Sequence, residues 1–369
     1  EVMGQLKDRI HPAQLGLSLG APLAALAIAA VISSILLLVT GYAPATVLST
    51  LGGRLGETNT LYDSLNRAIP LYLSATAVAI GFKMNLFNIG VEGQYKVGAL
   101  AAALAGAYTN LPAPLHILLC LVAAMVAGGL WATVPAVLKV KRGINEVVST
   151  IMLNFIAISL VAWLYTGVFK DSAKGDLNTK TKIMPKSAWM PDLLTSGSHM
   201  VNSFIIIAGA VGVGFYLLVW KSRFGFQLRA SGQNAFAART SGVDPKRMIV
   251  AAMVLSGALG GLVGLPELLG DKHAYTDTFS VGLGFDGIAV ALLGRKHPLG
   301  MALAAVVWGF LDAAGRFLDL EGIPREIVTI MQGVIVLAVV IVYQVAEQIS
   351  ERRVAAAAAE RLEIVAAAA

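Results

Sequence analysis

Asn85-Leu-Phe-Asn-Ile-Gly-Val-Glu-Gly-Gln94 is a polar stretch with two glycines that lies between two long apolar segments. The chain carries no charged residue from Ala68 to Phe82 before it, and none from Val97 to Leu138 after it. About 20 apolar residues are enough for a helix to cross the hydrocarbon core of a bilayer. The pattern therefore predicts membrane-spanning helices that are interrupted by a polar motif.

The composition of the whole chain agrees with this prediction. Of the 369 residues, 57% are hydrophobic and only 14% are charged, and the mean hydropathy is +0.73. Soluble domains carry roughly 25% charged residues. The net charge is +6, but the basic residues lie mostly in loops and not on a basic face with aromatics between them, so a nucleic-acid partner is not expected. The single cysteine, Cys120, lies inside an apolar run, so neither a disulfide framework nor a metal cluster is expected.

Runs without charge predict an all-α, polytopic membrane protein with about ten transmembrane helices. The predicted spans are residues 17–40, 64–82, 91–109, 114–137, 146–167, 201–220, 248–268, 283–294, 298–314 and 325–345. Pro112 and Pro114 should divide the long run 97–138 into two helices, because proline interrupts a helix. The segment 283–294 is too short to cross alone, which predicts a half-helix or a tilted span.

Lysine and arginine residues orient these spans, because loops on the cytosolic side carry the excess of both. Most of them fall on the inside when both termini are placed in the cytosol. Residues 1–345 then form a single transmembrane domain, and residues 346–369 form an alanine-rich cytosolic tail. The loop at about 221–247 lies inside, and the long, lysine-rich loop at about 168–200 lies outside.

Several polar or aromatic side chains in or beside the apolar segments are candidates for a solute path, because unpaired polar groups are costly in lipid. The candidates are Asn85, Phe87, Asn88, Glu92, Gln94, Asn154 and Asp286. Glu92 falls in the first turn of a predicted helix, where the positive helix end stabilises a carboxylate. Asn154 continues a polar stripe with Glu146 and Thr150 at spacings of four residues. The alternative is structural: these groups cap helices or join them, and the motif is a tight turn between two spans.

The loop at 221–247 should contain a short helix from Gln233 to Thr240, bracketed by Gly232 and Gly242. This helix would present Phe236 and its neighbours as an apolar face. It either docks into a groove on a soluble subunit or rests on anionic lipid as a basic connector.

The next span should open at Asp244-Pro245. Aspartate is a favoured N-cap, and proline is favoured at the first helical position.

The order Arg229-Ala-Ser-Gly-Gln-Asn234, followed by Ala237-Ala238 and Gly242-Val-Asp244, resembles the cytosolic coupling loop of bacterial ABC-importer permeases. The resemblance implies contact with the ATPase through Arg229, Gly232, Asn234, Ala237, Ala238 and Gly242. Three further stretches are similar to the branch that imports nucleosides with a basic-membrane-protein-type lipoprotein. They are Phe87-Asn-Ile-Gly-Val-Glu-Gly-Gln94, Ile144-Asn-Glu-Val-Val-Ser-Thr-Ile-Met-Leu-Asn154 and Gly284-Phe-Asp-Gly-Ile-Ala-Val-Ala-Leu-Leu-Gly294.

This resemblance, from about Leu61 to Tyr343, implies a permease subunit in the bacterial cytoplasmic (inner) membrane that forms half of a translocation path for nucleosides. Its partners would be an ATP-binding cassette subunit, a second homologous permease and an extracytoplasmic substrate-binding lipoprotein. No cofactor is expected in this chain, with ATP and Mg bound by the partner subunit. The chain has no Gly-x-x-x-x-Gly-Lys-Ser/Thr loop, no His-Glu-x-x-His and no Gly-x-Ser-x-Gly motif, so an enzyme is poorly supported.

Two alternatives remain open from the sequence. One is a permease for another polar solute, such as a pentose or a branched-chain amino acid. The other is a secondary transporter driven by an ion gradient. The loop at 221–247 argues against the second alternative, because such a carrier has no motor subunit to dock. The cargo follows from the family resemblance alone.

Overall fold

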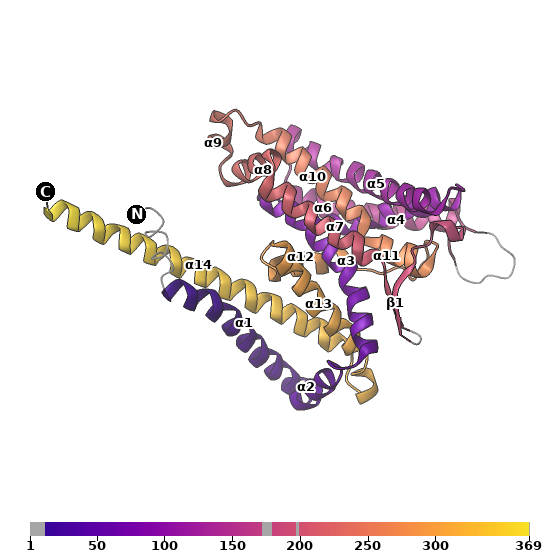
Figure 1. Cartoon of the computed structure of the whole chain (residues 1–369), viewed down its shortest axis with the longest axis horizontal. Helices are drawn as coiled ribbons and strands as arrows, with labels where there is room; N and C mark the ends of the chain where they lie inside the picture. The colour runs from indigo at the N-terminus through magenta and orange to yellow at the C-terminus, as the bar shows by residue number, and fades with distance from the viewer. Residues whose placement is uncertain (1–11, 172–178, 197–198, 369) are drawn as a thin grey trace. The chain divides into compact units, whose positions relative to one another are not determined.

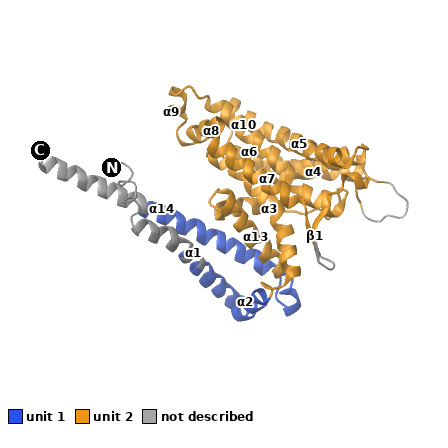
Figure 2. Ribbon diagram, in the orientation of Figure 1, with its two compact units in different colours: residues 1–53, 315–369 blue, residues 54–314 orange. Residues whose placement is uncertain are grey.

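The computed structural model of the chain describes residues 12–171, 179–196 and 199–368. They form two compact, mostly helical units, shown in separate colours in Figure 2. The larger unit is Arg54–Ala314, and the smaller combines Glu1–Gly53 with Gly315–Ala369.

The larger unit is a bundle of helices in a continuous run of sequence (Figure 1). In chain order its helices are α3 (Thr58–Lys83), α4 (Val91–Ala107), α5 (Ala113–Arg142), α6 (Glu146–Trp163), α7 (Phe204–Tyr216), α8 (Arg223–Gln233), α9 (Ala235–Thr240), α10 (Pro245–Gly261), α11 (Leu265–Glu267), α12 (Leu283–Leu293) and α13 (Pro298–Gly315). Single π-helical turns extend α6, α7 and α11 at Leu164–Val168, Leu217–Lys221 and Leu268–Lys272.

The smaller unit contains α1 (Pro12–Val39), α2 (Pro44–Gly53) and α14 (Glu326–Ala368). Helices α1 and α14 pack side by side (Figure 1), although they lie at opposite ends of the sequence. Gly41 has a φ of 86° in the turn between α1 and α2, a left-handed conformation that glycine adopts without strain. The alanine-rich tail continues α14 as helix.

Seven helices in the described residues are long and apolar enough to cross a membrane. They are Thr58–Lys83, Ala113–Arg142, Glu146–Val168, Phe204–Lys221, Pro245–Lys272, Pro298–Glu321 and Glu326–Ala346. The short helix predicted at 283–294 is confirmed as α12, which has 11 residues. The predicted proline break is also confirmed, since α4 ends at Ala107 and Pro112 is the N-cap of α5.

The prediction of an all-α chain is wrong in one place. The predicted outer loop holds two antiparallel strands, β1 (Asp192–Ser196) and β2 (His199–Asn202). Asn66 of α3 fixes the second strand, because its Nδ2 donates to the Met200 carbonyl at 2.6 Å and its Oδ1 accepts from the Asn202 N–H at 2.9 Å. The strands are missed from the sequence because they are short and their backbone pairs over a few residues only.

Helices α5 and α10 of the larger unit pack through small residues. A Cβ atom on Gly261 would lie 2.1 Å from the Ala124 carbonyl oxygen, and one on Gly128 would lie 2.3 Å from the Gly257 oxygen. Small residues four apart let two membrane helices approach to backbone contact. Helix α10 also packs against α3 and α4, so it lies beside the segment that connects these two helices.

Candidate functional site

The polar motif connects α3 to α4 through residues 84–90. The chain turns sharply after α3, because both the Met84 and Leu86 N–H groups donate to the Gly81 carbonyl at 2.9 Å. Asn85 follows with a φ of 57°, which asparagine tolerates better than most residues. The turn sends the next residues back into the bundle, where α4 begins at Val91.

Asn88, Gln94 and Ser256 form a buried amide cluster that joins α3, α4 and α10. The Asn88 Nδ2 donates to Gln94 Oε1, and the Gln94 Nε2 donates to Asn88 Oδ1, both at 3.0 Å. Asn88 Nδ2 also donates to Ser256 Oγ at 2.8 Å, and Ser256 Oγ donates to the Ala77 carbonyl at 2.6 Å. Buried polar groups whose hydrogen bonds are all made stabilise one specific arrangement of helices.

Asn154 joins α6 to the same motif. Its Nδ2 donates to the Ile89 carbonyl, and its Oδ1 accepts from the Gly93 N–H, both at 2.9 Å. Gly93 permits this contact, since a Cβ there would lie 2.9 Å from the Ala157 Cβ. At the other end of the polar stripe, Glu146 Oε2 lies 2.5 Å from Lys139 Nζ.

Glu92 connects the first turn of α4 to the first turn of α12. Its Oε1 accepts from the Gly282 N–H at 3.0 Å and its Oε2 from the Gly284 N–H at 2.9 Å. The side chain is 1% exposed. Tyr95 Oη lies 3.0 Å from Glu92 Oε1, and Lys96 Nζ lies 3.9 Å from the same oxygen. A carboxylate at a helix N-terminus satisfies free N–H groups and interacts favourably with the helix dipole.

Helix α12 lies against its neighbours because two of its residues have no side chain. A Cβ on Gly284 would lie 2.3 Å from the Glu92 N, and one on Gly287 would lie 1.9 Å from Ser74 Oγ. Asp286 stands between these glycines and is half-buried. In the described part of the chain its carboxylate accepts no hydrogen bond.

The predicted path residues therefore fall into two groups. Asn88, Glu92, Gln94 and Asn154 are buried and hydrogen-bonded to the protein. Of the remaining three, Asn85 and Phe87 are exposed and Asp286 is half-buried. Phe87 is 45% exposed, with its ring 5.0 Å from that of Phe82. The structure gathers the first group around the two interrupted helices, and the transport role of all seven stays a prediction.

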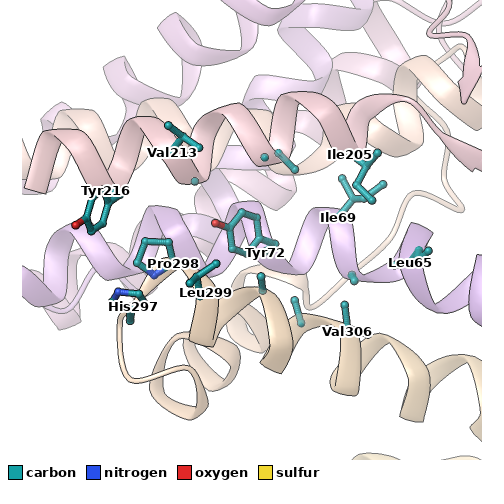
Figure 3. Close-up of a pocket in the computed structure, with 16 residues that line it drawn as sticks. Leu65, Ile69, Tyr72, Ile205, Val213, Tyr216, His297, Pro298, Leu299 and Val306 are labelled. Carbon is teal, nitrogen blue, oxygen red and sulfur yellow. The ribbon is translucent and has the colours of Figure 1, made fainter.

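A cavity of about 650 Å³ lies elsewhere, between α3, α7 and α13 (Figure 3). Its lining is almost entirely apolar and includes Ile69, Ile205, Val213, Leu299 and Val306. None of the predicted path residues lines it. Sequence reasoning missed this cavity because its side chains look like those of any lipid-facing helix.

The predicted docking helix is shorter than expected and begins at Ala235. Asn234 is its N-cap, and the Asn234 Oδ1 accepts from the N–H groups of Phe236 and Ala237 at 3.0 Å. Gly242 follows the helix with a φ of 80°, as the glycine after a helix end commonly does. Phe236 is 78% exposed, whereas Ala238 is buried. Helix α9 therefore presents one large apolar side chain outward.

Gly232 does not bracket this helix, because it lies inside α8. A Cβ there would lie 2.8 Å from both the Lys83 carbonyl oxygen and the Met84 Cα. The glycine thus packs α8 against the end of α3. Arg229, on the same helix, donates from Nε to the Gly225 carbonyl at 3.3 Å. The predicted N-cap Asp244 is confirmed, since its Oδ1 accepts from the Lys246 N–H at 2.9 Å.

The described residues contain no group of three or more His, Cys, Asp or Glu side chains that could hold a metal ion.

The larger unit has long apolar helices, and the buried carboxylate of Glu92 joins α4 to the short helix α12. Helix α9 presents an exposed aromatic residue. These features are those of a polytopic membrane permease. The family model described as branched-chain amino acid transport system / permease component matches residues 60–340. The chain therefore belongs to this permease family, and the resemblance to ABC-importer permeases is confirmed.

Curated relatives cover most of the chain. It is 36% identical over 327 residues to the guanosine ABC transporter permease protein NupP of Bacillus subtilis. The alignment covers 88% of this chain and 93% of the relative. It is 31% identical to the nucleoside ABC transporter permease protein NupB of Lactococcus lactis, over 85% of this chain and 88% of the relative. The glucose ABC transporter permease protein TsgB13 of Haloferax volcanii is 32% identical over 75% of each chain. No solved structure gave a significant match.

Proposed function

We propose that this permease is one half of the translocation path of an ATP-driven nucleoside importer. The observation that carries the proposal is the similarity to NupP, which is named for guanosine and matches over 88% of this chain. The similarity to NupB, named for nucleosides, supports the same cargo. A sugar is the second candidate, because TsgB13 is named for glucose.

The proposed assembly contains a second homologous permease, an ATP-binding cassette subunit that binds ATP and Mg, and an extracytoplasmic binding lipoprotein. We place it in the bacterial cytoplasmic membrane with ten spans, both termini in the cytosol, and residues 1–345 as one transmembrane domain. Helix α9 would contact the ATP-binding subunit, because its exposed Phe236 suits an apolar pocket on a soluble partner.

The passing solute would contact Asn85 and Phe87, whose side chains are exposed, and Asp286, whose half-buried carboxylate accepts no hydrogen bond in the described part of the chain. The buried group around Glu92 and the amide cluster would hold the two interrupted helices that border the path. Amide and carboxylate groups suit ribose hydroxyls and base edges, and Phe87 offers a ring on which a base can stack.

Uptake into proteoliposomes tests the cargo. The permease, co-purified with its ATP-binding subunit and second permease, would be supplied with binding protein and with labelled guanosine, uridine, ribose or glucose. ATP-dependent uptake of the nucleosides is expected, with ribose and glucose at background. Uptake of glucose in preference to both nucleosides would overturn the cargo, and uptake driven by an ion gradient without ATP would overturn the class.

A further inference from the structure

The cavity between α3, α7 and α13 is almost entirely apolar, with the Tyr72 hydroxyl part-way along it and polar side chains at one end (Figure 3). Leu65 lies at one end in that view, and Tyr216 and His297 lie at the other. Its volume of about 650 Å³ falls within the range of roughly 300–1,000 Å³ typical of ligand pockets. An apolar groove of this kind suits a hydrocarbon chain and offers little to a polar solute.

Three rings stand together at the polar end of the groove. The Trp220 ring centroid lies 5.5 Å from that of Tyr216 and 5.7 Å from that of His297. Lys83 Nζ lies 4.6 Å from the centroid of the Trp220 ring. The groove therefore leads through aromatic side chains to a lysine.

Lys83 belongs to a basic cluster with Lys296 and Arg229. Arg229 lies on α8, which packs against the end of α3 at Lys83 through Gly232. Lys296 precedes His297, which lines the groove. Lys296 Nζ lies 5.3 Å from the centroid of the Phe82 ring.

None of the three forms an ion pair with a carboxylate of the described residues. The ion pairs in this part of the chain involve other side chains, and the partners of the cluster are two aromatic rings and the Gly225 carbonyl. Cations that repel one another without a counter-ion attract an anion from outside the protein.

We propose that the groove binds an anionic phospholipid, with an acyl chain between α3, α7 and α13 and the phosphate at the basic cluster. A free anion would need the cations but not the groove, and a protein segment would need the groove but not the cations. Basic pockets between membrane helices are known to hold anionic headgroups, and aromatic rings favour the level of the headgroups. The phospholipid explains why the apolar groove and the unbalanced charge are contiguous.

Native mass spectrometry of the detergent-purified permease tests the proposal, with phosphatidylglycerol, phosphatidylcholine and inorganic phosphate added in parallel. We expect phosphatidylglycerol to be retained in preference to phosphatidylcholine. Each of Lys83→Gln and Lys296→Gln should reduce that preference about five-fold, the effect expected for one basic residue at an anionic surface. The matched control is Lys246→Gln, an exposed lysine outside the cluster, which should change nothing.

Gly209→Leu tests the groove apart from the charge. Gly209 lines the cavity, and a Cβ there meets no atom within 4 Å, so leucine should fill the groove without disturbing the helices. Retention of both lipids should fall, with the thermal midpoint unchanged. Equal retention of the two lipids by the unaltered permease would overturn the proposal. Displacement of phosphatidylglycerol by inorganic phosphate would overturn it too. So would a Gly209→Cys variant that maleimide fails to label after the lipid has been removed, because a protein segment would then fill the groove.

Discussion

Glu92 and Gly284 are held together in two ways. The Gly284 N–H donates to Glu92 Oε2 at 2.9 Å, and the missing Cβ of Gly284 leaves the space that the Glu92 backbone fills. The first contact satisfies the start of α12, and the second sets how closely α12 approaches α4. The packing of α12 against α4 therefore depends on this one pair of residues.

Gly284→Ala should destabilise the fold. The added Cβ would lie 2.3 Å from the Glu92 N, which is backbone and cannot rotate away. Overpacking of this kind costs roughly 1–3 kcal/mol. Thermal unfolding of the purified permease in detergent should show a lower midpoint. Gly214→Ala in α7 is the matched control, since a Cβ there meets nothing within 4 Å, and equal midpoints for the two variants would contradict the packing argument.

Glu92→Gln should also lower the thermal midpoint. The carboxylate accepts one N–H on each oxygen, whereas the amide would place its own NH₂ against one of these donors. A buried donor left without an acceptor costs roughly 1–3 kcal/mol.

Asp286→Asn separates stability from transport. Asp286 accepts no hydrogen bond in the described part of the chain, so its amide should leave the midpoint unchanged. A several-fold loss of uptake is expected if the carboxylate borders the path. Unchanged uptake in Asp286→Asn would exclude Asp286 from the path. Glu92 would be excluded if the loss of uptake in Glu92→Gln were no larger than the loss of folded protein.

Phe236→Ser should reduce uptake and transport-coupled ATP hydrolysis several-fold, while the midpoint stays the same. The side chain is 78% exposed, so its removal changes few contacts within the chain. Phe226→Ser is the matched control, because Phe226 is also exposed but lies on α8. Full coupling in Phe236→Ser would mean that the ATP-binding subunit docks elsewhere.

The orientation of the loops can be tested by labelling single cysteines in a Cys120→Ser background. Lys186→Cys and Ser241→Cys are suitable, since both positions are exposed. Ser187 and Ser231 are not, because Ser187 Oγ lies 2.8 Å from His116 Nδ1 and Ser231 is buried. An impermeant maleimide should label only position 186 in intact cells stripped of any outer barrier. Labelling of position 241 would reverse the proposed topology.

The sequence predicts the helices well because they are long and uncharged, and it predicts the cap at Asp244 because a cap depends on adjacent residues. The cap at Asn234 is missed, since this residue falls inside the helix predicted from Gln233 to Thr240. It also singles out the residues around Glu92, since polar groups in apolar runs are conspicuous. It does not reveal their partners. The contacts with Gly284 and Ser256 join residues that are far apart in the chain, and such pairings are set by packing. Gly232 shows the same limit: as a sequence feature it looks like a helix end, but it is a point of contact between α8 and α3.

His273 should make the segment around Trp189 sensitive to acid. The two rings stack with centroids 3.8 Å apart, and the His273 Nδ1 is buried without a partner in the described part of the chain. Burial lowers the pKa of His273 below its ordinary value, with Asp271 opposing the shift. The folded state therefore binds the proton less readily than the unfolded state. Its stability contribution is complete above pH about 6.5 and declines as the pH falls from there through the lowered pKa.

Hydrogen exchange of residues 184–190 at pH 5 and pH 7.5 measures this effect, with faster exchange expected at pH 5. His273→Asn is the matched variant, because asparagine tolerates the φ of 55° at this position but does not titrate. In the variant, residues 184–190 should exchange equally fast at the two pH values after correction for the intrinsic exchange rates. An equal acid response in the variant would assign the effect to another group, since the ring of His273 is the only part of the stack with Trp189 that takes up a proton.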